Sequence, residues 1–532
     1  MYQPQVEAWE GDEVRAYAAI AVVSKTHKAS NYGVVWFTAQ TEVDKVNRQV
    51  TLDQFQIIKV KFPAIPAKEP EYQAFLQAKL PGKSKVIALD RMEAALEVSD
   101  SGQAGVEALD VNNDPPNVIF TTKPSLLVLI DGPPQYRDVG GTNLQLMLNT
   151  RATILLDTKT REYYLNVMDG WLQAPDLVAG PWSYVAKIPV DMEEITKGIQ
   201  ERQQAQAAGK GTPPSLKHAE RDGKVPAIYV SVGPCELLVT EGPAQFDMIP
   251  GTELEYVKNT TANIFRDLGK LDYYTLLAGR WFRSQSLEHG PWRFVDGKSL
   301  PEKFASIPEN SPKAGALVSV PGTGPAKEAL IANSIPQTAT ISRREAQLDV
   351  KYDGDPLFKT IEGTNLQYAP NTSTPVIKVD DKTYYAIENA VWFVGASPAG
   401  PWAVASSVPA AIYSIPPSSS LHYVTYVKVY RSTPELVHLG YTPGYYGTVV
   451  SSSTSTVVYG TGWYYPPYVG SYWYGAPYTY GVGAASTWSS ESGWSITIGV
   501  GYTNYYPYYY PWWGPWGYYG PCCWGPAWGV GY

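Results

Sequence analysis

The chain has 532 residues, which is enough for two or three domains. Aromatic residues make up 13% of it and charged residues only 17%, whereas about a quarter is charged in a typical globular protein. The net charge is -8 and Lys and Arg form no cluster. Because phosphate binding needs concentrated positive charge, this composition argues against nucleic acid as a partner.

Residues 1–115 predict a β-rich domain that caps the repeats described below. Strands are expected over 14–23, 33–40 and 50–62, and a helix over 71–80. The apolar run 16–23 is short and follows several acidic residues, which is not the pattern of a signal peptide. A charge-poor protein rich in Tyr, Trp, Gly and Pro is nevertheless typical of the cell exterior. We therefore expect an extracellular, cell-surface or periplasmic protein whose leader is not present in this chain.

A repeated skeleton is the strongest signal in the sequence, and it occurs three times. Copy one contains Gly132, Gly141-Thr142, Asn149-Thr150, Tyr163-Tyr164, Trp171 and Gly180-Pro181-Trp182. Copy two contains Gly242, Gly251-Thr252, Asn259-Thr260, Tyr273-Tyr274, Trp281 and Gly290-Pro291-Trp292. Copy three contains Gly354, Gly363-Thr364, Asn371-Thr372, Tyr384-Tyr385, Trp392 and Gly400-Pro401-Trp402. The second Tyr precedes the first Trp by seven residues in every copy, so the three copies predict one shared local fold.

Short strands separated by turn residues fill the space between these landmarks, which predicts an antiparallel meander of four or five strands per copy. Leading strands are expected before the copies at 118–120, 228–230 and 339–341. A unit of this size has too little apolar area to be stable alone, so it must bury its faces against neighbours. The predicted fold class is mainly β, with repeated meanders arranged like a β-propeller, or alternatively as tandem β modules.

The repeat period of about 110 residues is longer than a bare propeller blade. The surplus residues predict helical inserts over 192–206 and 326–332. Repeat units are expected at 116–225, 226–336 and 337–420, followed by a degenerate fourth unit at 421–470. Residues 471–532 form a tail rich in Tyr, Trp, Gly and Pro.

The sequence contains few of the residue patterns that catalysis requires. Asp131, Glu241 and Asp353 occupy the same repeat position, and an acid present in every copy is typical of a turn rather than of one asymmetric active site. The five histidines share no metal-ligand spacing, and the common nucleophile motifs are missing. We therefore predict no catalytic residue, no metal site and no cofactor. The enzymatic alternative is a glycosidase, which needs two or more converging carboxylates.

Aromatic rings that recur in each copy are candidates for a glycan-binding surface, because aromatic faces stack on the apolar faces of sugars. The candidates are Trp171, Trp281, Trp392, Tyr164, Tyr274 and Tyr385. The alternative reading places a ring repeated in every copy in the core between units. Asn259 and Asn371 match the glycosylation sequon, but Asn149 does not, so a repeated turn is the better interpretation.

The tail has almost no charge: no Lys or Arg follows Arg431, and Glu491 is the only acid after Glu435. Frequent Gly and Pro argue against a transmembrane helix. Two readings stay open, a packed arm or a disordered adhesive tract, and strand character is clear only over 494–500. The cysteines, Cys235, Cys522 and Cys523, define no disulfide framework, and unpaired thiols are expected.

The skeleton, together with the segments 423–427 and 440–447, resembles a group of large bacterial proteins predicted to be exported, which are often labelled carbohydrate-binding or autotransporter-like. The resemblance covers about 116–470 and implies no catalytic residue. A second likeness joins the turn 397–402 to the turn between blade strands in five-bladed glycosidase propellers, and it implies blade geometry.

These observations predict a non-enzymatic, exported or cell-surface β-repeat protein. The expected partner is a glycan or another component of the cell envelope, or further copies of the chain in a homo-oligomer or filament built through the aromatic tail. Most recurring residues are explained as scaffold. The specific function is therefore expected where the copies differ: in the inserts, the degenerate fourth unit and the tail.

Overall fold

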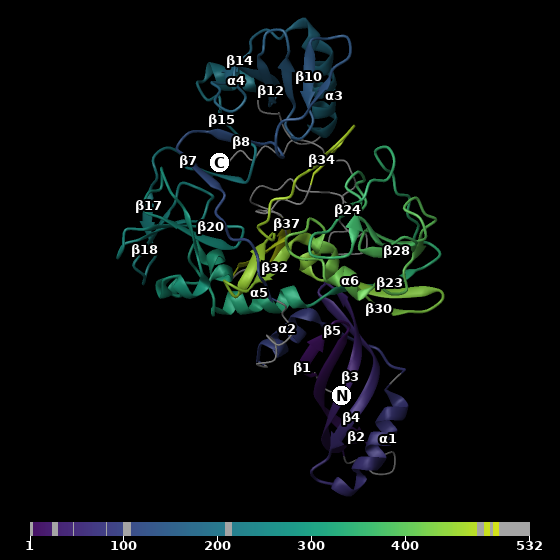
Figure 1. The fold of residues 1–532 in the computed structure, drawn as a ribbon. Coiled ribbons are helices and arrows are strands. Elements are labelled where there is room, and N and C mark those ends of the chain that lie inside the picture. The colour runs from purple at the N-terminus through teal and green to yellow at the C-terminus, as the bar shows by residue number, and fades with distance from the viewer. Residues whose placement is uncertain are drawn as a thin grey trace.

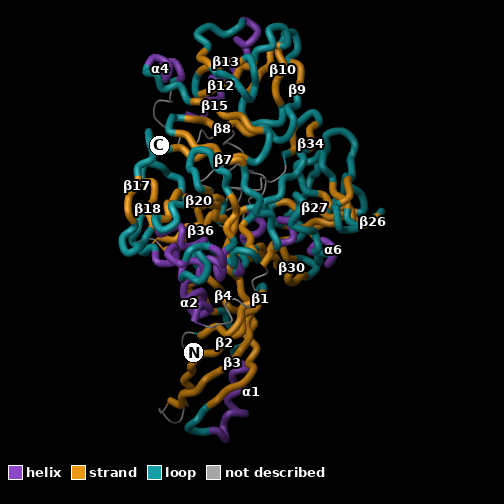
Figure 2. Tube along the Cα trace, turned by 60° about the vertical axis from the view of Figure 1, so that its left-hand side comes forward, coloured by secondary structure: helices purple, strands orange, loops and turns teal. Residues whose placement is uncertain are grey.

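The computed structural model describes residues 4–23, 30–45, 47–80, 82–98, 108–207, 215–475, 484–489 and 493–498. The protein is mainly β, with many antiparallel sheets and short helices. Figure 1 shows the N-terminal domain projecting below a body in which three repeat modules surround a common centre. Figure 2 shows from another side that the long N-terminal strands point away from that body.

The N-terminal domain is one antiparallel sheet in sequence order. Its strands are β1 (Gln5–Glu10), β2 (Glu13–Val23), β3 (Ser30–Asp44), β4 (Gln49–Lys61) and β5 (Lys85–Ala88), and its helices are α1 (Glu69–Lys79) and α2 (Leu89–Val98). Alternate residues of β2 and β3 point into a core that includes Phe37 and Phe55. The helix predicted over 71–80 is confirmed as α1.

Hydrogen bonds join this domain to the body at one end of β3. The Val43 amide donates to Thr338 Oγ1 over 2.8 Å, and the Lys45 amide donates to Gln337 Oε1 over 2.8 Å. Nearby, Arg431 Nε donates to Asp12 Oδ2 over 3.0 Å. Buried main-chain N–H groups of the N-terminal domain are therefore satisfied by side chains of the body.

Each copy of the skeleton folds as an antiparallel meander of six strands. Repeat 1 contains β9 (Tyr136–Asp138), β10 (Leu144–Met147), β11 (Ile154–Asp157), β12 (Tyr163–Val167), β13 (Gly170–Ala174) and β14 (Ser183–Tyr184). Repeat 2 contains β17 (Phe246–Met248), β18 (Leu254–Val257), β19 (Ile264–Asp267), β20 (Tyr273–Leu277), β21 (Arg280–Ser284) and β22 (Arg293–Val295). Repeat 3 contains β24 (Lys359–Thr360), β25 (Gln367–Tyr368), β26 (Val376–Asp380), β27 (Thr383–Glu388), β28 (Val391–Gly395) and β29 (Ala403–Val404). The expected four or five strands are too few, because edge strands of two or three residues carry no readable alternation.

The leading strands pair between repeats. They are β7 (Asn117–Thr121), β8 (Ser125–Leu129), β15 (Ala227–Ser231), β16 (Cys235–Val239), β23 (Gln337–Ser342), β30 (Val427–Ser432) and β31 (Leu436–Tyr441). β7 pairs in parallel with β16, and β8 pairs in parallel with β15, so repeats 1 and 2 exchange leading strands. β23 pairs antiparallel with β31, which also pairs with β30. The leading strands predicted from the sequence are confirmed, whereas the exchange was not predicted.

Helical segments follow each meander. They are η3 (Val190–Met192), α3 (Glu193–Ala207), α4 (Leu216–Arg221), η4 (Gly297–Ser299), η5 (Glu302–Ser306), η6 (Ala314–Ser319), α5 (Gly324–Ser334), α6 (Ala410–Tyr413), η7 (His422–Tyr426) and η8 (Pro443–Tyr446). The predicted inserts over 192–206 and 326–332 are confirmed as α3 and α5. The remaining strands are β6 (Ala108–Leu109), β32 (Thr448–Ser451), β33 (Thr456–Tyr459), β34 (Tyr468–Val469), β35 (Trp473–Tyr474), β36 (Ala484–Ser489) and β37 (Gly493–Ile498).

Every meander is the middle layer of three. One face of repeat 1 packs on β8 and β15, and one face of repeat 2 packs on β7 and β16. The opposite faces pack on the helical segments that follow, α3 in repeat 1 and η5 with η6 in repeat 2. Repeat 3 lies in the same way between the β23–β31 layer and the segments α6 and η7.

The first tryptophan of each copy bonds to the segment that follows its meander, which is helical in repeats 1 and 2 and is the first residue of β30, directly after η7, in repeat 3. Trp171 donates its indole N–H to Thr196 Oγ1 over 3.0 Å. Trp281 donates to the Ser319 carbonyl over 2.8 Å, and Trp392 donates to the Val427 carbonyl over 3.0 Å. A buried indole needs an acceptor, and here it is always supplied by the segment that follows the repeat.

The described strands form no closed propeller ring, so the propeller arrangement predicted from the repeats is not what the structure shows. In a propeller, the faces of neighbouring blades cover each other. Here leading strands cover one face of every meander and helical segments cover the other, which leaves no face for a neighbouring blade. The alternative of tandem β modules describes the arrangement better.

The tryptophan contact gives a stability prediction. Trp281→Ala removes a ring that is 1% exposed and leaves the Ser319 carbonyl without its donor, so the free energy of unfolding should fall by about 3–5 kcal/mol. Urea denaturation followed by circular dichroism measures the change. Tyr32→Ala, at a ring 63% exposed, is the control and should cost far less. Equal losses in the two variants would contradict this role of Trp281.

Candidate functional site

The repeated Asn-Thr pairs build one loop three times. The Asn371 side chain accepts from the Leu357 amide over 3.0 Å and donates to the carbonyls of Asp353 and Asp355. Asn149 and Asn259 make the equivalent three bonds in their copies. Asn371 is 0% exposed, so the interpretation as a repeated turn is confirmed for this position.

The acid that faces this loop differs in environment from copy to copy. Asp131 is buried, Asp353 is half-buried and Glu241 is exposed. Asp131 Oδ2 accepts from Trp473 Nε1 over 2.9 Å, and Oδ1 accepts from the Tyr464 hydroxyl over 3.3 Å. Asp353 Oδ2 accepts from the Ser471 amide over 2.6 Å. In two copies the carboxylate also binds a distant part of the chain, which the interpretation of these acids as turn residues did not include.

That part is residues 463–474, which we call the C-terminal aromatic segment. It follows β33 and contains the small hairpin of β34 and β35, but it carries no charged side chain. It is fastened between repeats 1 and 3 by the bonds to Asp131 and Asp353 and by Arg137, which donates to the Ser471 carbonyl over 3.1 Å. At its start, the Tyr465 hydroxyl donates to the Pro417 carbonyl over 2.8 Å.

The segment closes over Asp131 and changes its chemistry. Burial raises the pKa of the Asp131 carboxyl to about 6, and the hydrogen bonds from Trp473 and Tyr464 oppose that shift. Gly132, the next residue, has a φ of 79°, and a Cβ there would lie 3.1 Å from the Tyr464 hydroxyl oxygen. Gly242 and Gly354 have nearly the same φ, so the left-handed backbone favours glycine after the acid in every copy.

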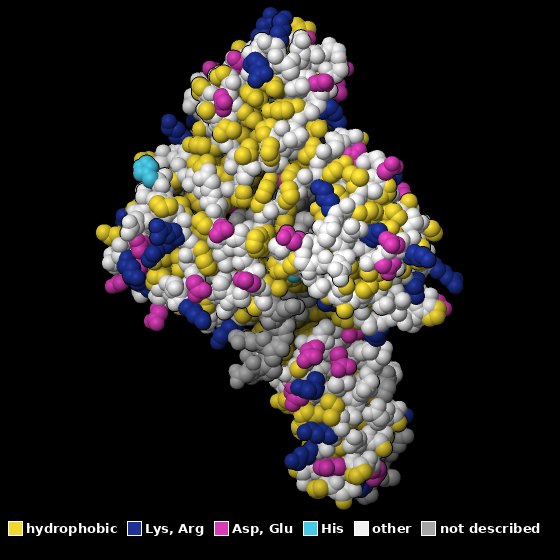
Figure 3. Space-filling view, viewed as in Figure 1, with side chains coloured by type: hydrophobic (Ala, Val, Ile, Leu, Met, Phe, Trp, Pro, Cys, Tyr) yellow, Lys and Arg dark blue, Asp and Glu magenta, His cyan; other side chains and the backbone are white. Residues whose placement is uncertain are grey.

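Several aromatic rings of the segment lie at the surface while its backbone is held. Trp463 is 41% exposed, Tyr464 is 40% exposed and Tyr472 is 65% exposed. The rings of Tyr468 and Tyr474 pack together with centroids 5.8 Å apart. Figure 3 shows hydrophobic side chains gathered along the centre of this face, from repeat 1 down to the meeting point of the modules.

The recurring rings predicted as a glycan surface lie elsewhere. Trp171, Trp281, Trp392, Tyr164, Tyr274 and Tyr385 are all buried, between their meanders and the following helical segments. A buried ring has no open face for a sugar. These six residues therefore belong to the core in this structure, as the alternative reading held.

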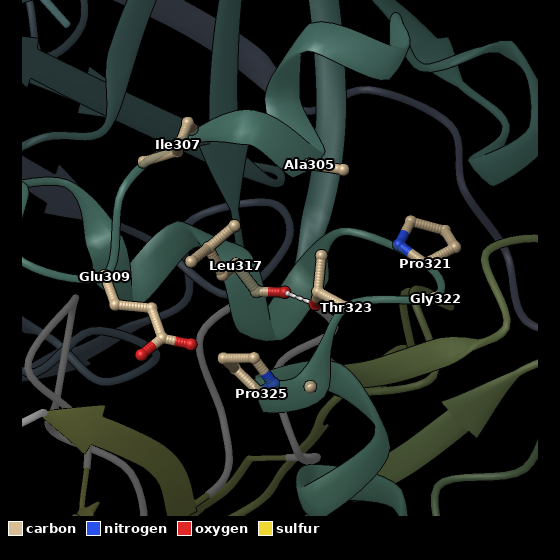
Figure 4. A pocket seen from close by; sticks show the side chains of 9 residues that line it. Ala305, Ile307, Glu309, Leu317, Pro321, Gly322, Thr323 and Pro325 are labelled. Carbon is tan, nitrogen blue, oxygen red and sulfur yellow. Dashed lines mark hydrogen bonds between the residues drawn. The ribbon is translucent and has the colours of Figure 1, made fainter. Parts of the chain in front are cut away.

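A pocket of about 330 Å³ lies beside α5, at the end of the repeat 2 insert (Figure 4). Glu309 is the only ionisable side chain in its lining, which otherwise consists of Ala305, Ile307, Leu317, Pro321, Gly322, Thr323, Gly324 and Pro325. The Thr323 hydroxyl is engaged as a donor to Leu317 and Val320 carbonyls. One carboxylate in the lining does not make the pair that glycoside hydrolysis needs.

The sequence showed the aromatic run that begins at Trp463, but it did not predict that this run binds the carboxylates of Asp131 and Asp353. A signal was present, since the run lacks charge and its Tyr and Trp side chains are donors suited to a carboxylate. The partner of those donors depends on the path of the chain between modules, which local patterns do not encode. Cys235 is buried and free, whereas Cys522 and Cys523 lie outside the described residues.

Comparisons with protein-family models, with curated proteins and with solved structures found no match to this chain. None of the helices in the described ranges reaches the length and hydrophobicity of a membrane-spanning helix.

The Asn-Thr loop predicts that the same substitution lowers the free energy of unfolding by different amounts in repeats 2 and 3. Asn371→Asp replaces a donor to two carbonyls by a carboxylate at a fully buried position, so it should lower the free energy of unfolding by about 3 kcal/mol or more. Asn259→Asp makes the same exchange where the side chain is partly exposed, and solvent should reduce the cost. Urea denaturation of both variants tests this order; a larger loss for Asn259→Asp would contradict it.

The Asp131 contact predicts a pH dependence. The carboxyl has a pKa of about 6 when the segment covers it and near 3.8 when exposed, so the covered state binds more protons between these values. Docking of 463–474 should therefore strengthen about tenfold as the pH falls from 7.5 to 5. Amide hydrogen exchange of the segment, corrected for intrinsic rates, measures this.

Two variants control the pH experiment. Asp131→Asn has no titrating group and should abolish the trend, whereas Asp353→Asn retains Asp131 and should keep it. Protection that weakens toward pH 5 in the unchanged protein would refute the assignment.

Proposed function

We propose that this chain is a non-enzymatic β-repeat protein that binds an uncharged glycan through the C-terminal aromatic segment. The observation that carries the proposal is the combination of exposed rings with a fixed backbone. Trp463, Tyr464 and Tyr472 each expose about two fifths or more of their surface, while Asp131 and Asp353 hold the chain between them.

Ring exposure supports glycan binding through the physics of stacking. The carbon-bound hydrogens of a pyranose form a weakly apolar face that packs on an aromatic ring, and hydroxyl groups at its edge need hydrogen-bond partners. Tyr472 and Ser471 are exposed, and their side-chain hydroxyl groups place such polar groups beside the rings. A backbone that is already ordered loses little conformational entropy when a ligand binds.

The absence of charged side chains in the C-terminal aromatic segment favours an uncharged ligand. The segment carries no charged side chain, and its nearest acids, Asp131 and Asp353, are engaged in its own attachment. Arg137 is the basic residue in contact with it, and it donates to the Ser471 carbonyl. An anionic polysaccharide would find no cluster of cations here, whereas a neutral one needs only rings and hydrogen-bonding groups.

The composition that led us to expect an exported protein supports a glycan of the cell envelope or its surroundings as the ligand. We therefore propose a location outside the cytoplasm, in the extracellular space, at the cell surface or in the periplasm. The resemblance to exported bacterial proteins labelled carbohydrate-binding agrees with this proposal. Assembly through the tail is a separate property, and glycan binding does not require it.

Binding of neutral oligosaccharides tests the proposal. Cellohexaose, chitohexaose and mannohexaose are titrated into the full chain, and tryptophan fluorescence and calorimetry report binding. Trp463→Ala and Tyr472→Ala should each weaken the binding of the active oligosaccharide about five- to thirtyfold, because a stacked ring contributes on the order of 1–2 kcal/mol.

The control variant removes an exposed aromatic ring that lies outside the C-terminal aromatic segment. Tyr32→Ala removes an exposed ring of the N-terminal sheet and should leave the affinity unchanged. Absence of binding to all three oligosaccharides, or equal losses in the Tyr32 variant, would overturn the proposal.

A further inference from the structure

A cluster of charged and polar side chains lies where the turn between β1 and β2 meets β30 and β31 of the body. Arg431 Nε, on β30, donates to Asp12 Oδ2 over 3.0 Å. His438 Nε2, on β31, lies 3.7 Å from the same carboxylate oxygen. Asp12 belongs to the N-terminal domain, so one oxygen of this domain faces two basic side chains of the repeat body.

The His438 ring is buried, at 7% exposed, and only one of its nitrogens is hydrogen-bonded. Nδ1 lies 3.1 Å from Thr340 Oγ1 of β23, and the tautomer of the ring decides which of the two donates. Nε2 is buried and has no hydrogen-bond partner among the residues that the structure describes. Its distance from Asp12 is too long for a hydrogen bond, so Asp12 stays bound to Arg431.

A proton on His438 changes the balance of this cluster. The ring becomes a second buried cation beside Arg431, and the two compete for Asp12 Oδ2. Burial and the charge of Arg431 lower the pKa of His438 from 6.5 to about 4, whereas the charge of Asp12 opposes that shift. The separated domains therefore take up a proton at His438 more readily than the docked ones do.

Two further titratable groups lie in the cluster. The ring of Tyr430, on β30, packs beside His438 with centroids 6.0 Å apart, and burial raises the pKa of its hydroxyl, which stays neutral. Asp53, on β4, faces Asp12 and Arg431, and burial raises the pKa of its carboxyl. Protonation of Asp53 therefore favours the docked state, which is opposite to the effect of His438.

Lys45 is a further buried cation of the domain boundary. Its Nζ donates to the Ala332 carbonyl over 3.0 Å, and burial lowers its pKa to about 8. Most of the change in its protonation on docking therefore occurs above pH 7.5. Of these groups, His438 is the one that predicts weaker docking as the pH falls from 7.5 to 5.5.

We propose that His438 is a pH-sensitive switch at the domain boundary, which weakens the attachment of the N-terminal domain to the repeat body when the ring takes up a proton. The direction is opposite to that of the C-terminal aromatic segment, whose docking strengthens as the pH falls. This inference goes beyond the proposed function, since it concerns another part of the molecule and needs no glycan.

Amide hydrogen exchange of the full chain at pH 7.5 and 5.5, corrected for intrinsic rates, tests the inference. The Val43 and Lys45 amides donate across the domain boundary, so their protection reports docking. It should fall about tenfold between the two pH values, because the docked state binds the proton at His438 more weakly. The Leu89 amide donates to the Arg48 carbonyl inside the N-terminal domain over 2.8 Å and should keep its protection.

Two histidine variants sharpen the experiment, and circular dichroism at pH 7.5 checks that both are folded. His438→Gln has no titrating ring and should abolish the fall in protection. His422→Gln is the matched control, because His422 is also 7% exposed but lies 2.7 Å from the Ile415 carbonyl, within the body. This variant should keep the fall.

The titration of the histidine rings in the unchanged protein, followed by nuclear magnetic resonance after selective labelling, does not depend on any variant being folded. One buried ring should titrate well below pH 6.5, in step with the loss of protection at Val43 and Lys45. Protection of these amides that stays constant or rises toward pH 5.5, an equal loss at Leu89, or a fall that persists in His438→Gln would each overturn the proposal.

Discussion

Covering both faces of a small antiparallel meander is the constraint on which the architecture depends. Six short strands provide two apolar faces and too little area for independent stability. The structure covers one face with leading strands and the other with the helical segment that follows, and the indole of one buried tryptophan joins the second layer to the first. Because the covering elements are exchanged or shared between neighbours, the modules become one body and need no closed ring.

Within that body, identical loops take on different tasks. The Asn-Thr loop is held by its asparagine side chain, which satisfies three backbone groups. The loop presents a carboxylate to its surroundings. In repeats 1 and 3 this carboxylate accepts hydrogen bonds from the C-terminal aromatic segment. The repeats therefore provide equivalent acceptor positions. They differ in whether, and through which atoms, the C-terminal aromatic segment binds to them.

The sequence was informative where local pattern decides the outcome. The spacing of the landmarks predicted three meanders, and the apolar runs before them predicted β7, β15 and β23. It was uninformative about which strand pairs with which, because the residues of β7 do not encode whether their partner is β8 or β16. The propeller expectation failed for the same reason, since it assumed how the faces are covered.

The candidate site was predicted only as a region. The absence of charge after Arg431 marked the tail as unusual, but the buried environment of Asp131 depends on Trp473 and Tyr464, more than three hundred positions away. The recurring rings were misleading because aromatic residues serve cores and surfaces equally well. Trp281 and Trp463 are the same residue type, and only the three-dimensional packing separates a 1% exposed ring from a 41% exposed one.

The two-residue strand β6 pairs in parallel with β32, so that Ala108 lies beside Val450. A ribosome would release most of the chain before this contact could form. The leading strands of repeat 1 would likewise stand without their partners until β15 and β16 had been made. Unpaired apolar strands are prone to join with other chains. During synthesis β7 and β8 therefore lack their native partners until β15 and β16 have been made.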